Sequence, residues 1–327
     1  MNNGIKKIKW GIIGCGNVTE VKSGPGFQKA DGSELIAVMR RDAILAEDYA
    51  QRHSVSKWYD NADALINDAD VDAVYVATPP NAHKEYTIKA LRAGKPVYVE
   101  KPMALNYGEC LEMIVESEKT STPLFVAYYR RALPRFLKIK SLIDEGVIGQ
   151  VNTVNINYCS KPSASDINRE YNWRVEPAVA GAGYFFDLGS HMIDLLQYYF
   201  GKISNVSGHA KNIGGYYSAE DAVDAAFTFE NGIKGAGSWN FCAGENLDST
   251  ELIGSKGKII FSTFSDAPIQ IVNGKGIEKI SIAHPEHVQQ PLIQLVTNEL
   301  LSNGKCPSTG QSGAHTSWVM DRILGRA

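Results

Sequence analysis

The sequence lacks the features that mark a secreted, zinc-binding or membrane protein. Its five cysteines are odd in number and scattered, and no CxxC pair occurs, which argues against a disulfide framework and against a zinc or dithiol site. No apolar run approaches the roughly 18 residues that span a bilayer. The short apolar stretch near the N-terminus runs into a glycine motif instead of a cleavage site. We therefore expect a soluble cytoplasmic protein.

The sequence also lacks a strong excess of charge. Its formal net charge is -3, and no long run of one sign occurs, so neither nucleic acid nor an anionic membrane surface is an expected partner. A small molecule is the more natural ligand. At 327 residues and 44% hydrophobic content, the chain is long enough for two packed cores.

The first third of the chain alternates short apolar runs with amphipathic ones. The apolar runs predict strands over residues 8–14, 34–39, 71–78 and 96–100. The amphipathic runs predict helices over residues 43–53, 61–68 and 83–94. Alternation of this length implies right-handed crossovers and a doubly wound parallel sheet.

The pattern changes after about residue 126. A helix is predicted over residues 135–146, followed by a strand with a period of two over 149–158. Further strands, joined by turns at Asn231-Gly232, Ser255-Lys256-Gly257 and Asn273-Gly274, are predicted within residues 204–213, 222–241, 249–263 and 269–283.

We therefore predict two domains, residues 1–126 for a dinucleotide and residues 127–327 for substrate binding and oligomerisation. The second is expected to be an α+β domain with a large, mostly antiparallel open sheet. A sheet face without helices needs a partner, which favours a homodimer or homotetramer formed through that sheet.

A glycine motif follows the first predicted strand. Gly14 allows a tight turn, and Gly16 lets the backbone, with Asn17 and Val18 after it, approach a pyrophosphate. Thr19 replaces the third small residue of the GxGxxG/A pattern, so the motif alone does not distinguish a cofactor site from a plain glycine turn. Its place at the start of several strand-helix units favours nucleotide binding.

The second predicted strand ends in two arginines, Arg40 and Arg41, where NAD-specific proteins carry an acidic residue. A guanidinium binds a 2′-phosphate in a fork, so NADP is the favoured cofactor. A solvated arginine pair is the alternative. Asp42 could still reach a ribose, which keeps NAD possible.

The third predicted strand ends in Thr78, Pro79, Asn81 and His83. Thr78 or Asn81 could cap the following helix while lining a cofactor crevice at the carboxyl end of the strand. His83 is either part of this crevice or a helix residue without chemical importance.

These segments, together with others along the chain, closely resemble the Gfo/Idh/MocA family of nicotinamide-dependent oxidoreductases. The resemblance covers nearly the whole chain and rests on "GIIGCGNVTEVKSGPGF", "VDAVYVATPPNAHKEYTIKALRAGKPVYVEKPMA", "GAGYFFDLGSHMIDLLQYYFG" and "AVDAAFTFENGIKGAGSW". It implies a Rossmann domain followed by a larger open-sheet domain, and an oligomer. It also implies a substrate such as a sugar, polyol, inositol or dihydrodiol.

The resemblance assigns roles to the "EKP" segment. Residues after the strand at 96–100 are expected to face the cofactor crevice, with Glu100 on the nicotinamide side. By the same resemblance, Lys101 is the active-site lysine, contacting both cofactor and substrate. A cis Lys101-Pro102 bond would aim this side chain.

Hydride transfer to or from a carbinol carbon needs an acid or base for the hydroxyl proton. Asp187 and His191 are four residues apart, on one face of a predicted helix, and match the DxxxH motif of the family. We assign His191 as general acid/base, Lys101 as the cation that polarises the reacting oxygen, and Asp187 as the group that orients His191 or binds a substrate hydroxyl. Exchanged roles for Lys101 and His191 remain open.

Two further pairs are candidate substrate contacts. Tyr129 and Arg130 lie at the predicted domain junction, and Trp173 and Arg174 combine an aromatic face with a hydrogen-bond donor, as a sugar requires. Core packing of the tryptophan and solvation of the arginines are the alternatives.

Other histidines do not indicate a metal site. His284 and His287 have neither an HExxH pattern nor a cysteine partner, so no metal is expected.

The predicted function is an NADP-dependent oxidoreductase acting on CH–OH groups. The alternatives are a redox-neutral, NAD-holding glycosidase of the same family, against which Arg40 argues, and a non-catalytic NADP-binding sensor. The joint presence of Lys101, Asp187 and His191 argues against the sensor.

Overall fold

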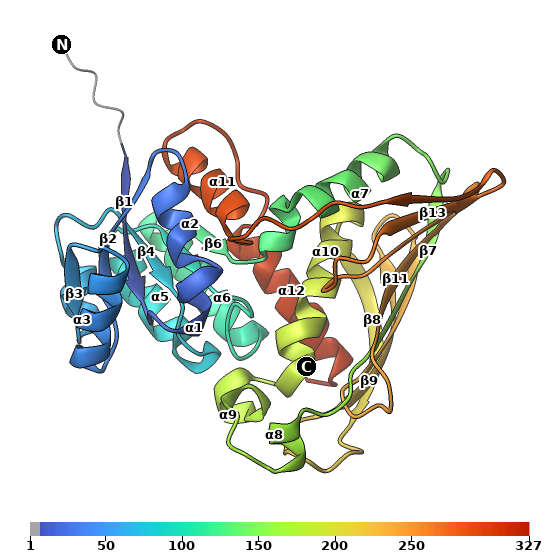
Figure 1. Ribbon diagram of the computed structural model, residues 1–327, viewed down its shortest axis with the longest axis horizontal. Coiled ribbons are helices and arrows are strands. Elements are labelled where there is room, and N and C mark those ends of the chain that lie inside the picture. The colour runs from blue at the N-terminus through green and yellow to red at the C-terminus, as the bar shows by residue number, and fades with distance from the viewer. Residues whose placement is uncertain (1–6, 327) are drawn as a thin grey trace. The chain divides into compact units, whose positions relative to one another are not determined.

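The computed structural model describes residues 7–326 and divides the chain into two compact units. The first extends to Leu133 and also takes in Pro285–Ala314, whereas the second comprises Pro134–His284 and the residues from His315 on. The sequence pattern had suggested one boundary after residue 126. The returning segment carries helix α11 (Gln290–Leu300), whose buried apolar face packs on helix α2 (Gly24–Lys29) of the first unit (Figure 1).

The first unit contains a parallel sheet in the order β3-β2-β1-β4-β5-β6. This confirms the predicted doubly wound fold. The pattern missed the three-residue strands β3 and β6. The strands are β1 (Ile8–Ile13), β2 (Ser33–Met39), β3 (Lys57–Tyr59), β4 (Ala73–Val76), β5 (Val97–Val99) and β6 (Leu124–Val126).

Helices surround this sheet in the first unit. The predicted helix that ends at Gly94 does so with that glycine at φ +72°, as a helix C-terminus favours. Besides α11, the helices are α1 (Asn17–Val21), α2 (Gly24–Lys29), α3 (Ala43–Arg52), α4 (Ala62–Ile66), α5 (His83–Arg92) and α6 (Tyr107–Thr120), with short turns η1 (Pro80–Ala82) and η2 (Tyr129–Ala132).

The helix after the glycine turn is interrupted. Helix α1 ends at Val21, and α2 restarts at Gly24 with Pro25 in its first turn. A Cβ on Gly24 would lie 2.2 Å from the Thr19 carbonyl oxygen and 2.4 Å from the Tyr49 hydroxyl. No side chain fits at Gly24, where α2 passes close to the backbone of α1 and to Tyr49 of α3 (Ala43–Arg52).

The second unit contains an eight-stranded sheet in the order β14-β13-β12-β11-β7-β10-β9-β8. The pairing of β7 with β10 is parallel, and the other pairs described are antiparallel. The three hairpins turn where predicted. The strands are β7 (Val151–Cys159), β8 (Ile203–Lys211), β9 (Ala222–Phe229), β10 (Lys234–Asn240), β11 (Leu247–Gly254), β12 (Gly257–Phe261), β13 (Ile269–Asn273) and β14 (Gly276–Ile280).

Helices of the second unit lie against one face of its sheet (Figure 1). On that face Trp239 of β10 packs edge-on against Phe185, with ring centroids 5.0 Å apart. On the opposite face Asn157, Asp224 and Ser238 are exposed. The helices are α7 (Pro134–Asp144), α8 (Ala164–Ile167), α9 (Pro177–Ala180) and α10 (Ser190–Phe200), with turns η3 (Trp173–Val175) and η4 (Phe185–Gly189), while α12 (Gly310–Ile323) continues from the first unit.

Within residues 7–326, no helix has both the length and the apolar character that crossing a bilayer requires.

Candidate functional site

The glycine turn after β1 leaves room for a ligand against its backbone. Gly14 has a φ of +92°, which favours glycine, and a Cβ there would lie 2.9 Å from Thr78 Cγ2. An added Cβ on Gly16 would meet only the Gly14 carbonyl oxygen, at 3.9 Å. The buried hydroxyl of Thr78 has no hydrogen-bond partner in the described part of the chain. These features fit the pyrophosphate end of a dinucleotide.

The first residues of α1 extend the backbone surface formed by Gly14 and Gly16. Asn17 is exposed and Val18 is half-buried. The first turn is held by Thr19, whose hydroxyl donates to the Gly16 carbonyl oxygen at 2.8 Å. The backbone around Gly16 is therefore fixed before any ligand binds.

A positive charge lies beside this turn. Arg40 and Arg41 are exposed directly after β2, and Nη1 of Arg40 donates to the carbonyl oxygen of Cys15 at 3.4 Å. The Asp42 carboxylate accepts from the Leu45 backbone N–H at 3.1 Å and so caps α3. A guanidinium, and not the Asp42 carboxylate, therefore contacts the glycine turn.

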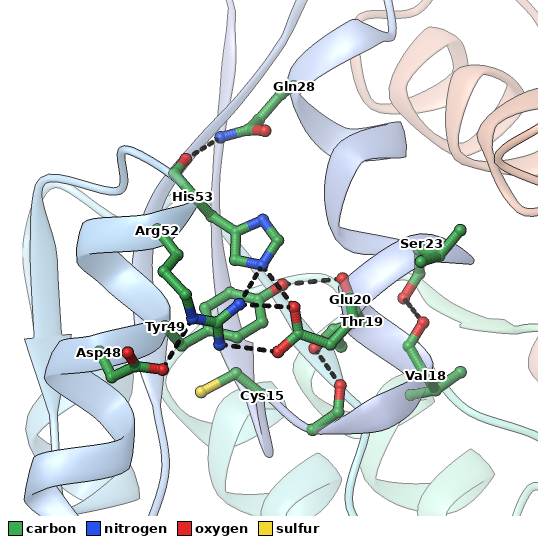
Figure 2. Close-up of polar contacts among 12 residues, drawn as sticks. Cys15, Val18, Thr19, Glu20, Ser23, Gln28, Asp48, Tyr49, Arg52 and His53 are labelled. Carbon is green, nitrogen blue, oxygen red and sulfur yellow. Dashed lines mark hydrogen bonds and ion pairs between the residues drawn. The ribbon is translucent and has the colours of Figure 1, made fainter.

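An ionic cluster that the sequence did not reveal joins α1 to α3 (Figure 2). The guanidinium of Arg52 donates from Nη1 and Nη2 to the two carboxylate oxygens of Glu20, both at 2.9 Å. Nε2 of His53 lies 2.7 Å from Glu20, and its ring stacks on Tyr49 at 4.1 Å. Arg52 also donates to Asp48 at 2.7 Å.

Hydrogen bonds from Arg52 lower the pKa of Glu20 to about 2. Burial raises the pKa of the nearby Cys15 thiol to about 11, which keeps it protonated and poorly nucleophilic. Glu20 is therefore charged at neutral pH, and its ion pair with Arg52 holds α1 against α3. The members of the cluster are 32 and 33 residues apart in sequence, so spacing alone could not identify it.

The residues after β4 have different environments. Pro79 and Asn81 are exposed, as ligand contacts would be. The expected helix cap is wrong, because neither η1 nor α5 has a side-chain cap.

The prediction that His83 contacts the cofactor needs correction. Its side chain is fully buried, with Nε2 2.7 Å from the Thr78 carbonyl oxygen and Nδ1 2.9 Å from that of Pro102. Burial lowers the pKa of His83. This imidazole links two loops of the first unit instead of facing a ligand.

Glu100 and Lys101, the two charged residues after β5, differ in their exposure to solvent. Lys101 is half-buried, and the Lys101-Pro102 bond is cis, as predicted. Glu100 is only 7% exposed. Its Oε1 accepts hydrogen bonds from Tyr75 and Gln289, both at 2.5 Å. The Glu100 carboxylate is therefore satisfied inside the first unit, and its expected contact with the nicotinamide stays a prediction.

Tyr129 and Arg130 form part of turn η2 at the end of the first unit's main segment. They are 8% and 7% exposed, and the Arg130 guanidinium carbon lies 5.2 Å from the Tyr129 ring centroid. Solvation, the alternative considered for Arg130, does not apply.

Asp187 and His191 lie on consecutive helical turns of the second unit. Asp187 belongs to the π-helical turn η4, a distortion that often accompanies functional sites, and His191 to the start of α10. His191 is 3% exposed, and the Phe264 ring lies edge-on to it at 6.1 Å. Nearly the whole imidazole is thus shielded from bulk water.

The structure brings three predicted residues of the second unit together. Nε of Arg174 lies 3.6 Å from the Asp187 carboxylate, and its guanidinium carbon is 4.5 Å from the Trp173 ring centroid. Trp173 is half-buried and Arg174 is exposed. Core packing of Trp173 is therefore only partial. Its aromatic face lies next to the Arg174 cation, which in turn lies near the Asp187 anion.

A neighbouring polar group was missed by the sequence analysis. The Tyr184 hydroxyl donates to Asp166 at 2.9 Å and accepts from Asn172 at 2.9 Å. Burial raises the pKa of Tyr184 to about 12. Tyr184 stands three positions before Asp187, but its partners come from the separate segment that contains α8 and η3, which no local pattern connects to it.

The histidines set aside above are engaged in protein contacts. Nδ1 of His287 donates to the Val21 carbonyl oxygen at 2.7 Å, and Nε2 accepts from Lys29 at 2.6 Å. His284 lies 3.7 Å from Asp266. Among the residues that the structure describes, no cluster of three or more His, Cys, Asp or Glu side chains could hold a metal ion.

Two family models match the chain in succession. The oxidoreductase family with an NAD-binding Rossmann fold matches residues 8–128, and the GFO/IDH/MocA C-terminal domain matches residues 136–260. Oxidoreductase P35 of Formosa agariphila is 41% identical over 321 residues, which cover 98% of this chain and 99% of the relative.

More distant relatives have named activities. The 1,5-anhydro-D-fructose reductase of Ensifer adhaerens is 25% identical over 93% of this chain and 92% of its own. The trans-1,2-dihydrobenzene-1,2-diol dehydrogenase of Mus musculus is 28% identical over 82% and 78%. Levoglucosan dehydrogenase, solved with NADH and levoglucosan, has the same fold, with a TM-score of 0.86 at 22% identity over 98% of this chain and 97% of that one.

Replacing Glu20 by Gln tests how much the Glu20–Arg52 ion pair stabilises the attachment of α1 to α3. Since the pKa of Glu20 is lowered when folded, its stabilisation is present above about pH 5 and lost as pH falls toward 2. With 34% of the side chain exposed, solvent screening limits the expected loss of unfolding free energy at pH 7 to about 1 kcal/mol. Denaturant titrations at pH 7, 5 and 4 should show the difference from wild type shrinking.

Asp48→Asn is the matched control, because it removes only the exposed contact to Arg52 and should cost no more than about 0.5 kcal/mol. A Glu20→Gln deficit that stayed constant with pH would rule out the ionic explanation.

Proposed function

The chain belongs to the GFO/IDH/MocA family of NAD(P)-dependent oxidoreductases, and from this membership we propose an NADP-dependent dehydrogenase or reductase acting on a sugar, polyol or dihydrodiol. When bound, the nicotinamide supplies or accepts the hydride. The observation that carries the proposal is the His191 imidazole, 3% exposed, on the same helical segment as an Asp187 carboxylate that faces Arg174. The anhydro-sugar and dihydrodiol substrates named for two relatives support the substrate class.

Arg40 supports NADP as the cofactor. Its guanidinium lies beside the turn that carries Gly14 and Gly16, and Arg41 adds a second exposed cation. A guanidinium binds a phosphate through two parallel hydrogen bonds. One oxygen of the Asp42 carboxylate is engaged in the cap of α3.

We assign Lys101 to the reacting oxygen. A cation there stabilises the negative charge that develops on this oxygen during oxidation or reduction. Lys101 follows β5 directly and is half-buried, so part of its charge is shielded from water. Shielding strengthens its interaction with a developing oxyanion.

We assign His191 to proton transfer. In oxidation its neutral imidazole accepts the hydroxyl proton, and in reduction the imidazolium returns a proton to the carbonyl oxygen. Asp187 stabilises the cationic form and, held by Arg174 at 3.6 Å, has a restricted position. Trp173 supplies an apolar face for a sugar ring, and Arg174 and Asp187 supply partners for its hydroxyls.

We also propose that two copies associate through the outer face of the second unit's sheet. That face carries exposed small or polar side chains and an open depression of about 600 Å³ lined by residues that include Asn155, Asp224, Ala236 and Ser238. A flat surface of small residues on strands allows close approach of an identical surface.

Cofactor preference is tested by titrating purified protein with NADPH and NADH while following cofactor fluorescence. Wild type should bind NADPH more tightly. Arg40→Ala should weaken NADPH binding by about 10- to 100-fold, the effect of losing a charge-assisted hydrogen bond, with little effect on NADH. Arg92→Ala, an exposed arginine paired with Glu116, is the control. Tighter NADH binding, or a nucleotide that does not exchange, would refute the NADP assignment.

The catalytic roles are tested with Lys101→Met and His191→Asn. Turnover should fall by about 10² to 10⁴ in each, as expected for a lost acid/base or oxyanion partner, while NADPH affinity stays close to wild type. Nicotinamide absorbance is followed over a panel of anhydro sugars, inositols and dihydrodiols, with exposed Lys119→Met as control. Near-normal turnover in either variant would remove that residue from the mechanism.

The oligomer is tested by size-exclusion chromatography with light scattering. Wild type should elute at twice the 35.8 kDa chain mass or more, and the double variant Ala226→Arg/Ala236→Arg should elute as a monomer, because four buried cations would face one another in a dimer. A monomeric wild type would contradict the proposal.

A further inference from the structure

The carboxylate of Glu100 sits among core residues at the end of β5. Tyr75 and Tyr98, the aromatic residues next to it, are fully buried and stack at 5.1 Å. The Tyr75 hydroxyl donates to Oε1 of Glu100 at 2.5 Å. Burial, and next the Glu100 charge, raises the pKa of Tyr75 well above its ordinary value, so the phenol keeps the proton that it donates.

Gln289 completes this network from the returning segment. Its side-chain Nε2 donates to the same Glu100 oxygen at 2.5 Å, and its Oε1 accepts from the Tyr98 hydroxyl at 3.1 Å. Its backbone N–H donates to the Lys22 carbonyl oxygen at 3.1 Å. Gln289 is only 1% exposed. Its two hydrogen bonds occupy both ends of the amide within the first unit.

The other Glu100 oxygen holds the backbone of Lys101. Oε2 accepts from the Lys101 N–H at 3.1 Å, while the Glu100 N–H donates to the Val76 carbonyl oxygen at 2.9 Å. On the far side of the lysine, the Pro102 carbonyl oxygen lies 2.9 Å from Nδ1 of His83. The main chain of Lys101 is thereby restrained on both sides.

We propose that Gln289 is a positioning residue for Lys101, acting through the Glu100 carboxylate. The inference rests on the function proposed above, in which Lys101 contacts the reacting oxygen. Gln289 and Tyr75 fix one carboxylate oxygen, so the other stays aimed at the Lys101 N–H. Loss of Gln289 leaves a buried carboxylate short of a donor, and the carboxylate turns toward another partner. The lysine backbone then loses a restraint.

A glutamine suits this position for a chemical reason. Its amide donates to Glu100 and accepts from Tyr98 at the same time, which a carboxylate or an ammonium side chain cannot do. It adds no second charge to the buried site. The contact joins residues 189 positions apart, so it forms only when the segment after His284 has returned to the first unit.

The test compares Gln289→Leu, Tyr75→Phe and a control, Gln294→Leu. Gln294 belongs to α11, the helix that Gln289 directly precedes, and also anchors the returning segment, accepting from the Asp31 N–H at 2.7 Å and donating to the Asp31 carbonyl oxygen at 3.0 Å. It has no contact with the Glu100 network. Any general loosening of the segment is therefore shared by the control.

The first measurement is the rate at which trace acetic anhydride labels Lys101 relative to Lys119 in the same molecule, read by mass spectrometry on the full chain. Gln289→Leu should change this ratio by about threefold or more, equivalent to roughly half a pKa unit or a comparable change in access. Gln294→Leu should leave it unchanged. A ratio in Gln289→Leu equal to wild type would overturn the proposal, and this readout needs no substrate.

The second measurement is turnover with NADPH or NADP and an active substrate from the panel above. Gln289→Leu should lower kcat by about 10- to 100-fold, as expected for a misplaced catalytic group, with KM nearly unchanged. A raised KM at unchanged kcat would overturn the positioning role. If Gln289→Leu does not fold, Tyr75→Phe removes one donor to the same oxygen and should change the labelling ratio in the same direction.

The two proposals fail separately. A labelling ratio that changes in Gln289→Leu, together with a wild type that oxidises or reduces no substrate, would leave the positioning role intact and refute the proposed reaction. A labelling ratio that does not change in Gln289→Leu, in an enzyme whose wild type is active, would refute the positioning role and leave the proposed reaction intact.

Discussion

A buried carboxylate at the end of a core strand is the constraint around which the first unit is organised. Taking a charge out of water costs several kcal/mol unless hydrogen bonds replace the lost solvent. Glu100 receives them from Tyr75, Gln289 and the Lys101 N–H. One of these donors comes from the far end of the chain. This donor is one of the contacts that hold a segment after the large second sheet to the first unit, and it ties that segment to the "EKP" motif.

Close contacts of glycine backbone determine the shape of the glycine turn in the first unit. Gly14 turns against Thr78, and the helix that follows stops after one turn and restarts at Gly24. A short helix is marginally stable by itself. Here the Glu20–Arg52 ion pair and the Tyr49 hydrogen bond to the Thr19 carbonyl oxygen hold it to α3. The turn therefore keeps a ligand-binding backbone although the glycine pattern is incomplete.

In the proposed function, the second unit contributes the acid/base and the groups that recognise the substrate. The π-helical turn that carries Asp187 also carries Phe185, which packs on Trp239 of the sheet, and the turn continues directly into α10. Rigid packing limits the positions that His191 can take, and the Arg174 contact limits those of Asp187. Membership of an oxidoreductase family agrees with this chemistry, because hydride transfer requires a matching proton transfer.

Apolar periodicity in the sequence predicted most strands of both sheets, several helices, the hairpin turns and the glycine turn, but not β3, β6, α6, α11 or α12. The predicted elements depend on near neighbours, whose spacing sets which face is buried. Short motifs likewise indicated Lys101, Asp187 and His191 as candidate site residues. Tertiary structure alone decided that Glu100 and His83 point into the core, that Arg174 meets Asp187, and that Gln289 reaches Glu100. Such contacts join residues far apart in the chain, and no local pattern records them because their energy exists only once the elements have packed.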